Sequence, residues 1–473
     1  MGSIGNSTDP TQPALSESAN ESRDSIFSED VVRYHCSLLG SSDELHEVEE
    51  DSIAPVVRSC VFAKKSNCEE TPNATQFGLL GGLRSKLPEQ MAAPTDDHRI
   101  FFNVSTPSST FICGSQGSGK SHTLSCILEN CLISSKAGRL SNPLTGVVFH
   151  YDTFISDSLG SPCEAAFLSS HPDVEVRVLC SPTNIRTIQV GNLPFNIEVS
   201  PLQIDQKHLN TKRMLDLMAV GQDNGPIPLY MHTIKRILRE MRMSQQQSRT
   251  GFDYQDFKQR ITFSGLNRSQ IAPLTQRLDT LESFMPKAQT MYTRKGSPHG
   301  SDWKPKARRL TIVDLSCPCI SPETACSLFN VCLGIFLEQD SEIGRVVALD
   351  ESHKYMNSSI EAQEFTETLL SAVRLQRHLG ARMIISTQEP TISPALLNLC
   401  SLVQQITLLS PRKNQTEAKA ASSLYLTKLL NFESEKRFFL VPVLSLGSLV
   451  AMGVTYRSND WEMVICASKC VTG

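Results

Sequence analysis

The chain has 473 residues, of which 40% are hydrophobic and 20% are charged, and its formal net charge is −4. These proportions are ordinary for globular proteins and exclude a wholly disordered or fibrous chain. The length suits about three domains. Because the net charge is slightly negative, charge gives no support to a nucleic-acid partner, although it does not exclude one.

The first part of the chain differs from the rest in charge. Residues 1–55 contain twelve acidic and two basic residues. Such a segment buries too little apolar surface to offset its ordering entropy, so we predict a disordered acidic tail. It lacks the apolar stretch of a signal peptide. The fifteen cysteines form no C-x-x-C pair and favour a reducing compartment. We therefore expect an intracellular protein, cytoplasmic or nuclear, and not a secreted one.

Residues 56–105 contain short strand-like pieces and are predicted to be a β-rich lead-in. From residue 106 onward, short apolar runs alternate with helical patterns, which predicts an α/β fold with a mainly parallel sheet. Apolar runs without alternation are typical of strands buried on both faces. The predicted strands are Thr110–Cys113, Gly146–Tyr151, Leu310–Asp314, Arg345–Asp350, Ala381–Ser386 and Leu402–Leu409, and the predicted helices are Ser121–Ile133, Pro322–Glu338, Ser359–Leu379 and Lys413–Leu430.

Residues 152–309 interrupt this rhythm. They contain one strand, Val174–Leu179, and then helical stretches, so we predict a mainly helical subdomain inserted between core segments 106–151 and 310–460. The stretch 286–309 is basic. A run of this kind is usually a solvated loop, with contact to a phosphate backbone as the alternative.

The segment Phe438–Tyr456 contains no charged residue and is long enough to span a bilayer. It also contains proline, glycine and serine, which favour two strands joined by a turn. The predicted strands are Phe438–Leu444 and Leu449–Thr455. We expect no membrane partner.

The most specific motif matches G-x4-G-K-[ST], the phosphate-binding loop. It follows an apolar strand and opens a helix, the context in which glycines let backbone N–H groups face phosphates. The lysine would reach the β and γ phosphates of ATP, and the final serine would bind Mg²⁺. The predicted nucleotide-binding residues are Gly114, Ser115, Gln116, Gly117, Ser118, Gly119, Lys120, Ser121 and the adjacent His122.

Two further strands end in polar residues. An apolar strand ends at Asp350 and Glu351, where the aspartate would hold Mg²⁺ and the glutamate would act as a general base on water. Another ends near Gln388, which could bond a γ-phosphate oxygen or the water. The alternative is that these are ordinary polar residues at strand ends with no role in catalysis. Asp314, His150 and Asp152 are weaker candidates, since strand-end residues of this kind are often caps. No metal-ligand cluster can be read from spacing.

These motifs resemble the FtsK–HerA group of P-loop ATPases. The run of residues 350–355 resembles the Asp-Glu-Ala-His form of that group, and residues 384–390 resemble its strand with a sensor glutamine before proline. The wider chain is similar to uncharacterised fungal P-loop proteins that share the phosphate loop and residues 209–214. The resemblance implies a RecA-like ATPase core. Relatives that pump DNA have an N-terminal β-barrel, for which residues 56–105 are too short.

We therefore expect Mg²⁺-dependent ATP hydrolysis, coupled to remodelling or translocation of nucleic acid or protein. The alternative is a nucleotide-gated scaffold with little turnover. A small-molecule kinase is disfavoured, because it needs an acceptor site rather than a hydrolytic glutamate. A homo-oligomeric ring would allow an arginine to act in the neighbouring subunit. Arg374, Arg377 and Arg382 are the candidates, and Arg377 matches a basic pair of the resembled group.

Overall fold

The structure is a computed structural model that describes residues 54–58, 76–83, 99–153, 162–193, 195–219, 229–290, 299–340, 342–389, 392–409, 438–445, 454–457 and 462–465. These residues belong to one compact unit that begins at Ser52. The acidic segment up to residue 53, the predicted helix Lys413–Leu430 and most of the predicted turn after Phe438–Leu444 lie outside the described residues.

A parallel sheet forms the centre of the fold. Its strands lie in the order β13-β12-β4-β11-β10-β6-β9-β7-β8, and every neighbouring pair is parallel. The predicted α/β fold class is therefore confirmed. The strands are β4 Ser109–Gly114, β6 Thr145–His150, β7 Glu175–Cys180, β8 Glu198–Pro201, β9 Arg309–Asp314, β10 Arg345–Leu349, β11 Ala381–Thr387, β12 Leu402–Leu409 and β13 Phe438–Ser445.

The central strands are buried on both faces, as their continuous apolar runs predict. Every residue of β4, β6, β10 and β11 is buried. Because successive side chains point to opposite faces, Val347 and Leu349 join one hydrophobic cluster, whereas Val346 and Ala348 join the other. The two clusters form the cores above and below the sheet.

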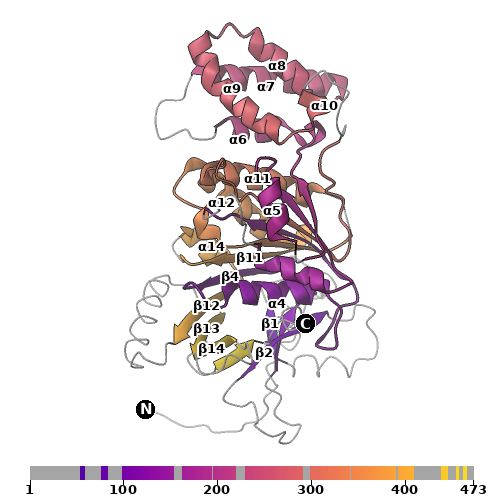
Figure 1. Cartoon of the computed structure of the whole chain (residues 1–473), viewed down its shortest axis with the longest axis vertical. Helices are drawn as coiled ribbons and strands as arrows, with labels where there is room; N and C mark the ends of the chain where they lie inside the picture. The colour runs from indigo at the N-terminus through magenta and orange to yellow at the C-terminus, as the bar shows by residue number, and fades with distance from the viewer. Residues whose placement is uncertain are drawn as a thin grey trace, which may run out of the picture. The chain divides into compact units, whose positions relative to one another are not determined.

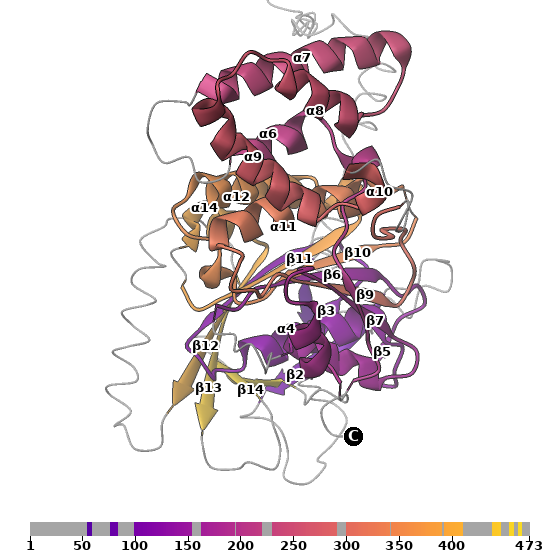
Figure 2. The same ribbon diagram turned by 45° about the horizontal axis from the view of Figure 1, so that its top comes forward.

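Helices cover the two faces of the sheet separately, as Figures 1 and 2 show. Helix α4 (Lys120–Leu132) and the short 3-10 helix η2 (Glu164–Ser170) pack on one face. On the other face lie α11 (Pro322–Glu338), α12 (Ile360–Arg374) and α14 (Pro394–Leu399). The shorter elements of the core are α5 Ile185–Gly191, η3 Gln206–His208, η4 Ser352–Lys354 and α13 Gln376–Leu379.

Helix α11 spans the range that the sequence predicts, and its start has a clear local cause. The hydroxyl of Ser321 accepts a hydrogen bond from the N–H of Thr324, and Pro322 occupies the first turn, where it needs no N–H partner. The predicted helix Ser359–Leu379 is instead divided into α12 and α13 at Leu375.

An antiparallel extension continues the sheet beyond β13, in the order β14-β15-β2-β3-β1, with β5 beside β2. It combines segments from both ends of the chain. Strand β13 agrees closely with the predicted Phe438–Leu444 and pairs antiparallel with β14, with Pro442 opposite Tyr456. Strand β14 overlaps the predicted strand Leu449–Thr455 only at its first two residues. No helix in the part of the chain that the structure describes is long and apolar enough to cross a membrane. The strands are β1 Val56–Arg58, β2 Phe77–Leu83, β3 Arg99–Asn103, β5 Gly138–Arg139, β14 Val454–Arg457 and β15 Glu462–Ile465.

The helical segment is narrower than the predicted range 152–309. Strands β7 and β8 belong to the parallel sheet, and the run of consecutive helices α6 to α10 occupies Thr211–Thr290. Their buried side chains continue the hydrophobic cluster of α11. The helices are α6 Thr211–Ala219, α7 Leu229–Ser248, α8 Tyr254–Thr262, α9 Arg268–Ser283 and α10 Lys287–Thr290.

Candidate active site

The three predicted motifs meet at the carboxyl edge of the parallel sheet. Strand β11 lies between β4 and β10, with Thr387 level with Cys113 and Ile385 level with Leu349. The residues that follow these strands therefore share one edge, where ligands of open α/β sheets bind. Sheet order thus places Gln388 between the phosphate loop and the acidic pair after β10.

The phosphate loop connects β4 to α4 as a tight turn. Gly117 and Gly119 have φ values of 73° and 95°, a backbone conformation that favours glycine. Residues 115–117 are exposed, whereas Ser118 is fully buried. The hydroxyl of Ser118 has no hydrogen-bond partner among the described residues. The loop thus presents exposed backbone and an unsatisfied hydroxyl at the start of a helix, where the helix dipole favours an anion.

Lys120 is the first residue of α4 and is only 3% exposed. Its ammonium donates a hydrogen bond to the carbonyl oxygen of Ser115 (3.2 Å) and lies 3.7 Å from a carboxylate oxygen of Glu351. The lysine therefore connects the phosphate loop directly to the acidic pair after β10. A buried cation held by one carbonyl and one carboxylate can exchange these partners for phosphate oxygens.

Glu351 lies at the centre of a hydrogen-bonded group. Its Oε2 accepts a hydrogen bond from the side-chain amide of Gln388 at 3.0 Å and lies 3.5 Å from Nε2 of His353. The backbone N–H of Gln388 donates to Nδ1 of His353 at 3.4 Å, which leaves Nε2 to carry the proton. Burial lowers the pKa of His353, and Lys354 and Lys120 lower it further, although Glu351 opposes them. A neutral histidine and an amide therefore orient the glutamate.

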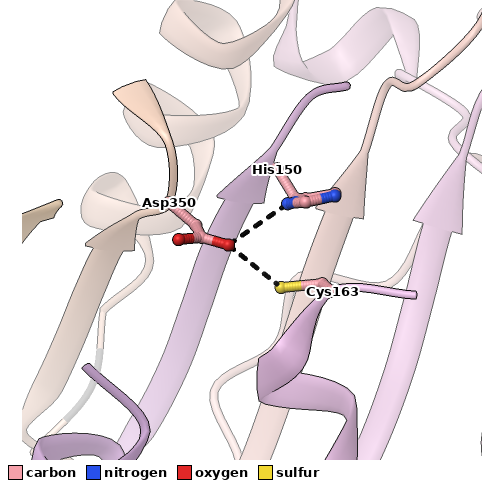
Figure 3. A group of neighbouring side chains, drawn as sticks. All are labelled: His150, Cys163 and Asp350. Atoms are coloured by element: carbon pink, nitrogen blue, oxygen red, sulfur yellow. Dashed lines mark hydrogen bonds and ion pairs between the residues drawn. The ribbon is translucent and has the colours of Figure 1, made fainter. Parts of the chain in front are cut away.

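Asp350 is buried beside Glu351 but faces different residues (Figure 3). Its Oδ2 lies 3.3 Å from Nδ1 of His150 and accepts a long hydrogen bond of 3.9 Å from the thiol of Cys163. Its Oδ1 points away from both and has no hydrogen-bond partner within the described part of the chain. Burial lowers the pKa of His150, but Cys163 and the Asp350 carboxylate raise it, so that the pKa lies well above its usual value.

Glu164, the first residue of η2, is an acidic residue of the site that the sequence analysis did not select. Its carboxylate is hydrogen bonded to the hydroxyl of Ser121, the predicted Mg²⁺ ligand. Burial, and then the charge of Asp350, raise the pKa of Glu164, while the bond to Ser121 lowers it. Three carboxylates therefore gather at the end of the phosphate loop, together with a serine hydroxyl.

Other predicted residues lie outside this group. His122 points along α4, with Nε2 3.7 Å from the sulfur of Cys126.

The candidate arginines lie far from the phosphate loop of their own chain. Arg377 is exposed on α13, before β11, whereas Gln388 follows β11. A strand of seven residues spans about 20 Å. Arg377 and the phosphate loop of the same chain therefore lie at opposite ends of the sheet. Arg382 is buried and donates to the carbonyl oxygens of Gly380 and Ser105, a structural role.

The weaker strand-end candidates have structural partners as well. Asp314 is buried beside His150 in the sheet register and accepts a hydrogen bond from the N–H of Ser316 at 2.9 Å. Asp152 lies 3.2 Å from the ammonium of Lys354.

The described part of the basic stretch 286–309 is largely neutralised. Lys306 and Arg309 pair with Glu175, and Arg308 lies 3.3 Å from Asp173. These ion pairs favour the solvated-loop interpretation over contact with a phosphate backbone.

No family model matches the chain, and no curated protein matches it, so the resemblance to fungal P-loop proteins has no support from these comparisons. Among solved structures, VirB4 of Thermoanaerobacter pseudethanolicus matches with 10% identity and a TM-score of 0.44, covering 83% of this chain and 96% of VirB4. EssC (ATPases 2 and 3) from Geobacillus thermodenitrificans matches with 12% identity and a TM-score of 0.31, covering 85% and 46%. At these scores the likeness defines no family.

Proposed function

We propose that this chain hydrolyses ATP with Mg²⁺ at the carboxyl edge of its parallel sheet. The observation that carries the proposal is the contact between motifs far apart in the sequence. Lys120 of the phosphate loop lies 3.7 Å from Glu351, which in turn bonds Gln388 at 3.0 Å. Hydrolysis of a γ-phosphate requires a lysine that binds phosphate, a carboxylate that acts as a base, and a polar group that orients the reactants. These three side chains contact one another in sequence here.

The residues present fit a magnesium ion. Ser121 supplies a hydroxyl oxygen, and Asp350 supplies Oδ1, which is buried with no hydrogen-bond partner in the described structure. Such oxygen ligands are those that Mg²⁺ prefers, and the ion, when bound, neutralises charge on the phosphates. Glu164 already bonds the hydroxyl of Ser121, so it would hold this hydroxyl in position for the ion.

Each side chain of this site has a separate role in the proposed hydrolysis. Lys120 binds phosphate oxygens in place of its present partners. Glu351 accepts the proton of the attacking water, and the amide of Gln388 holds the glutamate in position. A nucleotide-gated scaffold would need the binding residues but not a carboxylate oriented by an amide and a histidine. The arrangement around Glu351 therefore favours turnover over simple gating.

The test is phosphate release by the purified full chain. We expect ATP to be hydrolysed in the presence of Mg²⁺, and EDTA to reduce the rate to background, because Ser121 and Asp350 would then hold no ion. Adding excess Mg²⁺ should restore the rate. If the protein retains ATP with Mg²⁺ but releases no phosphate, the scaffold alternative replaces the enzyme.

Self-association is the further part of this proposal, and it is supported by the position of Arg377. The residue is exposed and cannot reach the phosphate loop of its own chain. It could reach the loop of a neighbouring subunit, where an arginine is worth roughly 10³–10⁵ in rate. We expect Arg377→Ala to bind ATP normally and to lose hydrolysis.

Mixing Arg377→Ala with Lys120→Ala tests the action in trans, because one interface of a mixed oligomer pairs an intact loop with an intact arginine. We expect partial recovery of phosphate release in samples shown to contain mixed oligomers. A fully active monomer would contradict the role, and so would the lack of any recovery. Arg268→Ala, which removes an exposed arginine at the start of α9, is the matched control.

A further inference from the structure

Three potential metal ligands meet next to the proposed magnesium site. His150 ends β6, Cys163 precedes η2, and Asp350 follows β10. Their nearest ligand atoms, Nδ1, Sγ and a carboxylate oxygen, all lie within 4.8 Å of one another (Figure 3). The three residues are only 7%, 3% and 3% exposed. The sequence gives no sign of this group, since the first two residues are thirteen apart and the third comes much later.

The distances suit a tetrahedral ion. Nδ1 of His150 is 3.3 Å from Oδ2 of Asp350, and Sγ of Cys163 is 3.9 Å from the same oxygen. Nitrogen, oxygen and sulfur ligands around Zn²⁺ are about 3.3–3.6 Å apart when the bond lengths are typical. The nitrogen–oxygen distance already fits, and the sulfur must move closer to the other two atoms, which lie within 4.8 Å of it.

One of the three ligand atoms lacks a hydrogen bond. Nδ1 of His150 lies 3.3 Å from Oδ2 of Asp350 as an ion pair, without the geometry of a hydrogen bond. Buried polar atoms left in this way are costly, and a bound cation removes the cost. Imidazole, thiolate and carboxylate together are a ligand set for Zn²⁺ and not for Mg²⁺, which takes oxygen ligands.

We propose that Nδ1 of His150, Sγ of Cys163 and Oδ2 of Asp350 form a Zn²⁺ site with a fourth position open to water. Three protein ligands and one open position are typical of zinc sites that are not purely structural. Binding releases two protons to the buffer, one from the thiol of Cys163 and one from the imidazolium of His150, so that a thiolate sulfur and a neutral Nδ1 hold the ion.

Sharing Asp350 gives the site a regulatory consequence, which rests on the proposed function. The carboxylate would serve Zn²⁺ through Oδ2 and the nucleotide-bound Mg²⁺ through Oδ1. A second dication on the same carboxylate withdraws negative charge from Mg²⁺ and repels it. Zn²⁺ would therefore inhibit ATP hydrolysis, and a chelator selective for zinc would reverse the inhibition.

Cobalt provides a readout that does not depend on activity. Co²⁺ is added to the full chain, and the near-ultraviolet charge-transfer band of a cobalt thiolate is recorded. We expect a band that saturates at one ion per chain and disappears when Zn²⁺ is added. Cys163→Ser should remove the band, whereas Cys319→Ser, which removes an exposed thiol, should keep it. A band that survives Cys163→Ser, or no band in the natural chain, would overturn the site.

His150→Ala is the second variant, and thermal unfolding by circular dichroism checks that each variant is folded. Loss of this ligand should weaken cobalt binding by at least about 10–100-fold, the loss seen when outer partners of metal sites are removed. Equal affinity in a folded variant would contradict the ligand set. Zn²⁺ should slow phosphate release by the natural chain but not by Cys163→Ser, each relative to its own zinc-free rate. Cobalt binding without inhibition would reject the regulatory consequence alone, and a chain that binds cobalt but hydrolyses no ATP would reject the proposed function alone.

Discussion

Replacing Glu351 by glutamine is expected to keep ATP binding and to lower the rate of phosphate release by about 10²-fold or more, the usual contribution of a general base. The amide has the same shape and preserves the contact with Gln388, but it cannot accept a proton from water. The substitution also removes a carboxylate that lies 3.7 Å from Lys120. Because that carboxylate competes with phosphate for the ammonium, the affinity for ATP should stay equal or rise.

The measurements are single-turnover phosphate release and equilibrium binding of a fluorescent ATP analogue. Glu367→Gln makes the same chemical change on the exposed surface of α12 and is the matched control; it should match the natural chain in both assays. The backbone of Glu351 has a φ of 48°, which is unusual for a residue other than glycine. Glutamine meets the same constraint, so the comparison isolates the carboxylate. Hydrolysis by Glu351→Gln at the natural rate would show that another group is the base.

The core of the fold could be predicted from the sequence because its signals are local. Buried parallel strands are continuous apolar runs, so the predicted range Leu402–Leu409 agrees with β12 and the others differ by one or two residues. The phosphate loop carries its own spacing, and the polar residues after β10 and β11 mark the edge of the sheet. Sheet order, which the sequence does not contain, is what brings Gln388 to Glu351.

Other parts of the site depend on contacts that no periodicity records. Cys163 and Glu164 lie at the start of a 3-10 helix, an element with no strong apolar pattern. Their place in the site can be recognised only from the folded structure, in which η2 packs against α4 and brings Glu164 to Ser121. His353 belongs to a quoted motif, but its contacts with both Glu351 and Gln388 require the folded geometry.

The edge strand β8, inside the predicted range 152–309, could not be recognised for a related reason. Strand β8 has only four residues and its burial is incomplete, because it lies at the edge of the sheet, beside β7 alone. Such a short edge strand has no continuous apolar run. Helix α8 has a clear local start, because the side chain of Asp253 accepts hydrogen bonds from the N–H groups of Gln255 and Asp256.

Replacing Lys120 by alanine is expected to abolish tight ATP binding. The ammonium is the buried cation of the phosphate loop, and its present partners, the carbonyl oxygen of Ser115 and the carboxylate of Glu351, mark where phosphate oxygens would bind. Loss of one partner in a buried, hydrogen-bonded charge pair costs about 2–5 kcal/mol, or roughly 30-fold to several thousand-fold in Kd. Removal of the lysine also leaves the Glu351 carboxylate without its cation, which adds repulsion against the phosphates.

Binding of the labelled ATP analogue measures this effect directly, and the shift in melting temperature on adding ATP measures it independently, because a ligand that binds the folded state raises its stability. The natural chain should show both signals and Lys120→Ala neither. Lys235→Ala, at an exposed position of α7, changes the net charge equally and should bind ATP like the natural chain. A melting temperature measured without ATP identifies any loss of folding. If folded Lys120→Ala binds the analogue with unchanged Kd, residues 114–121 are not the phosphate-binding loop.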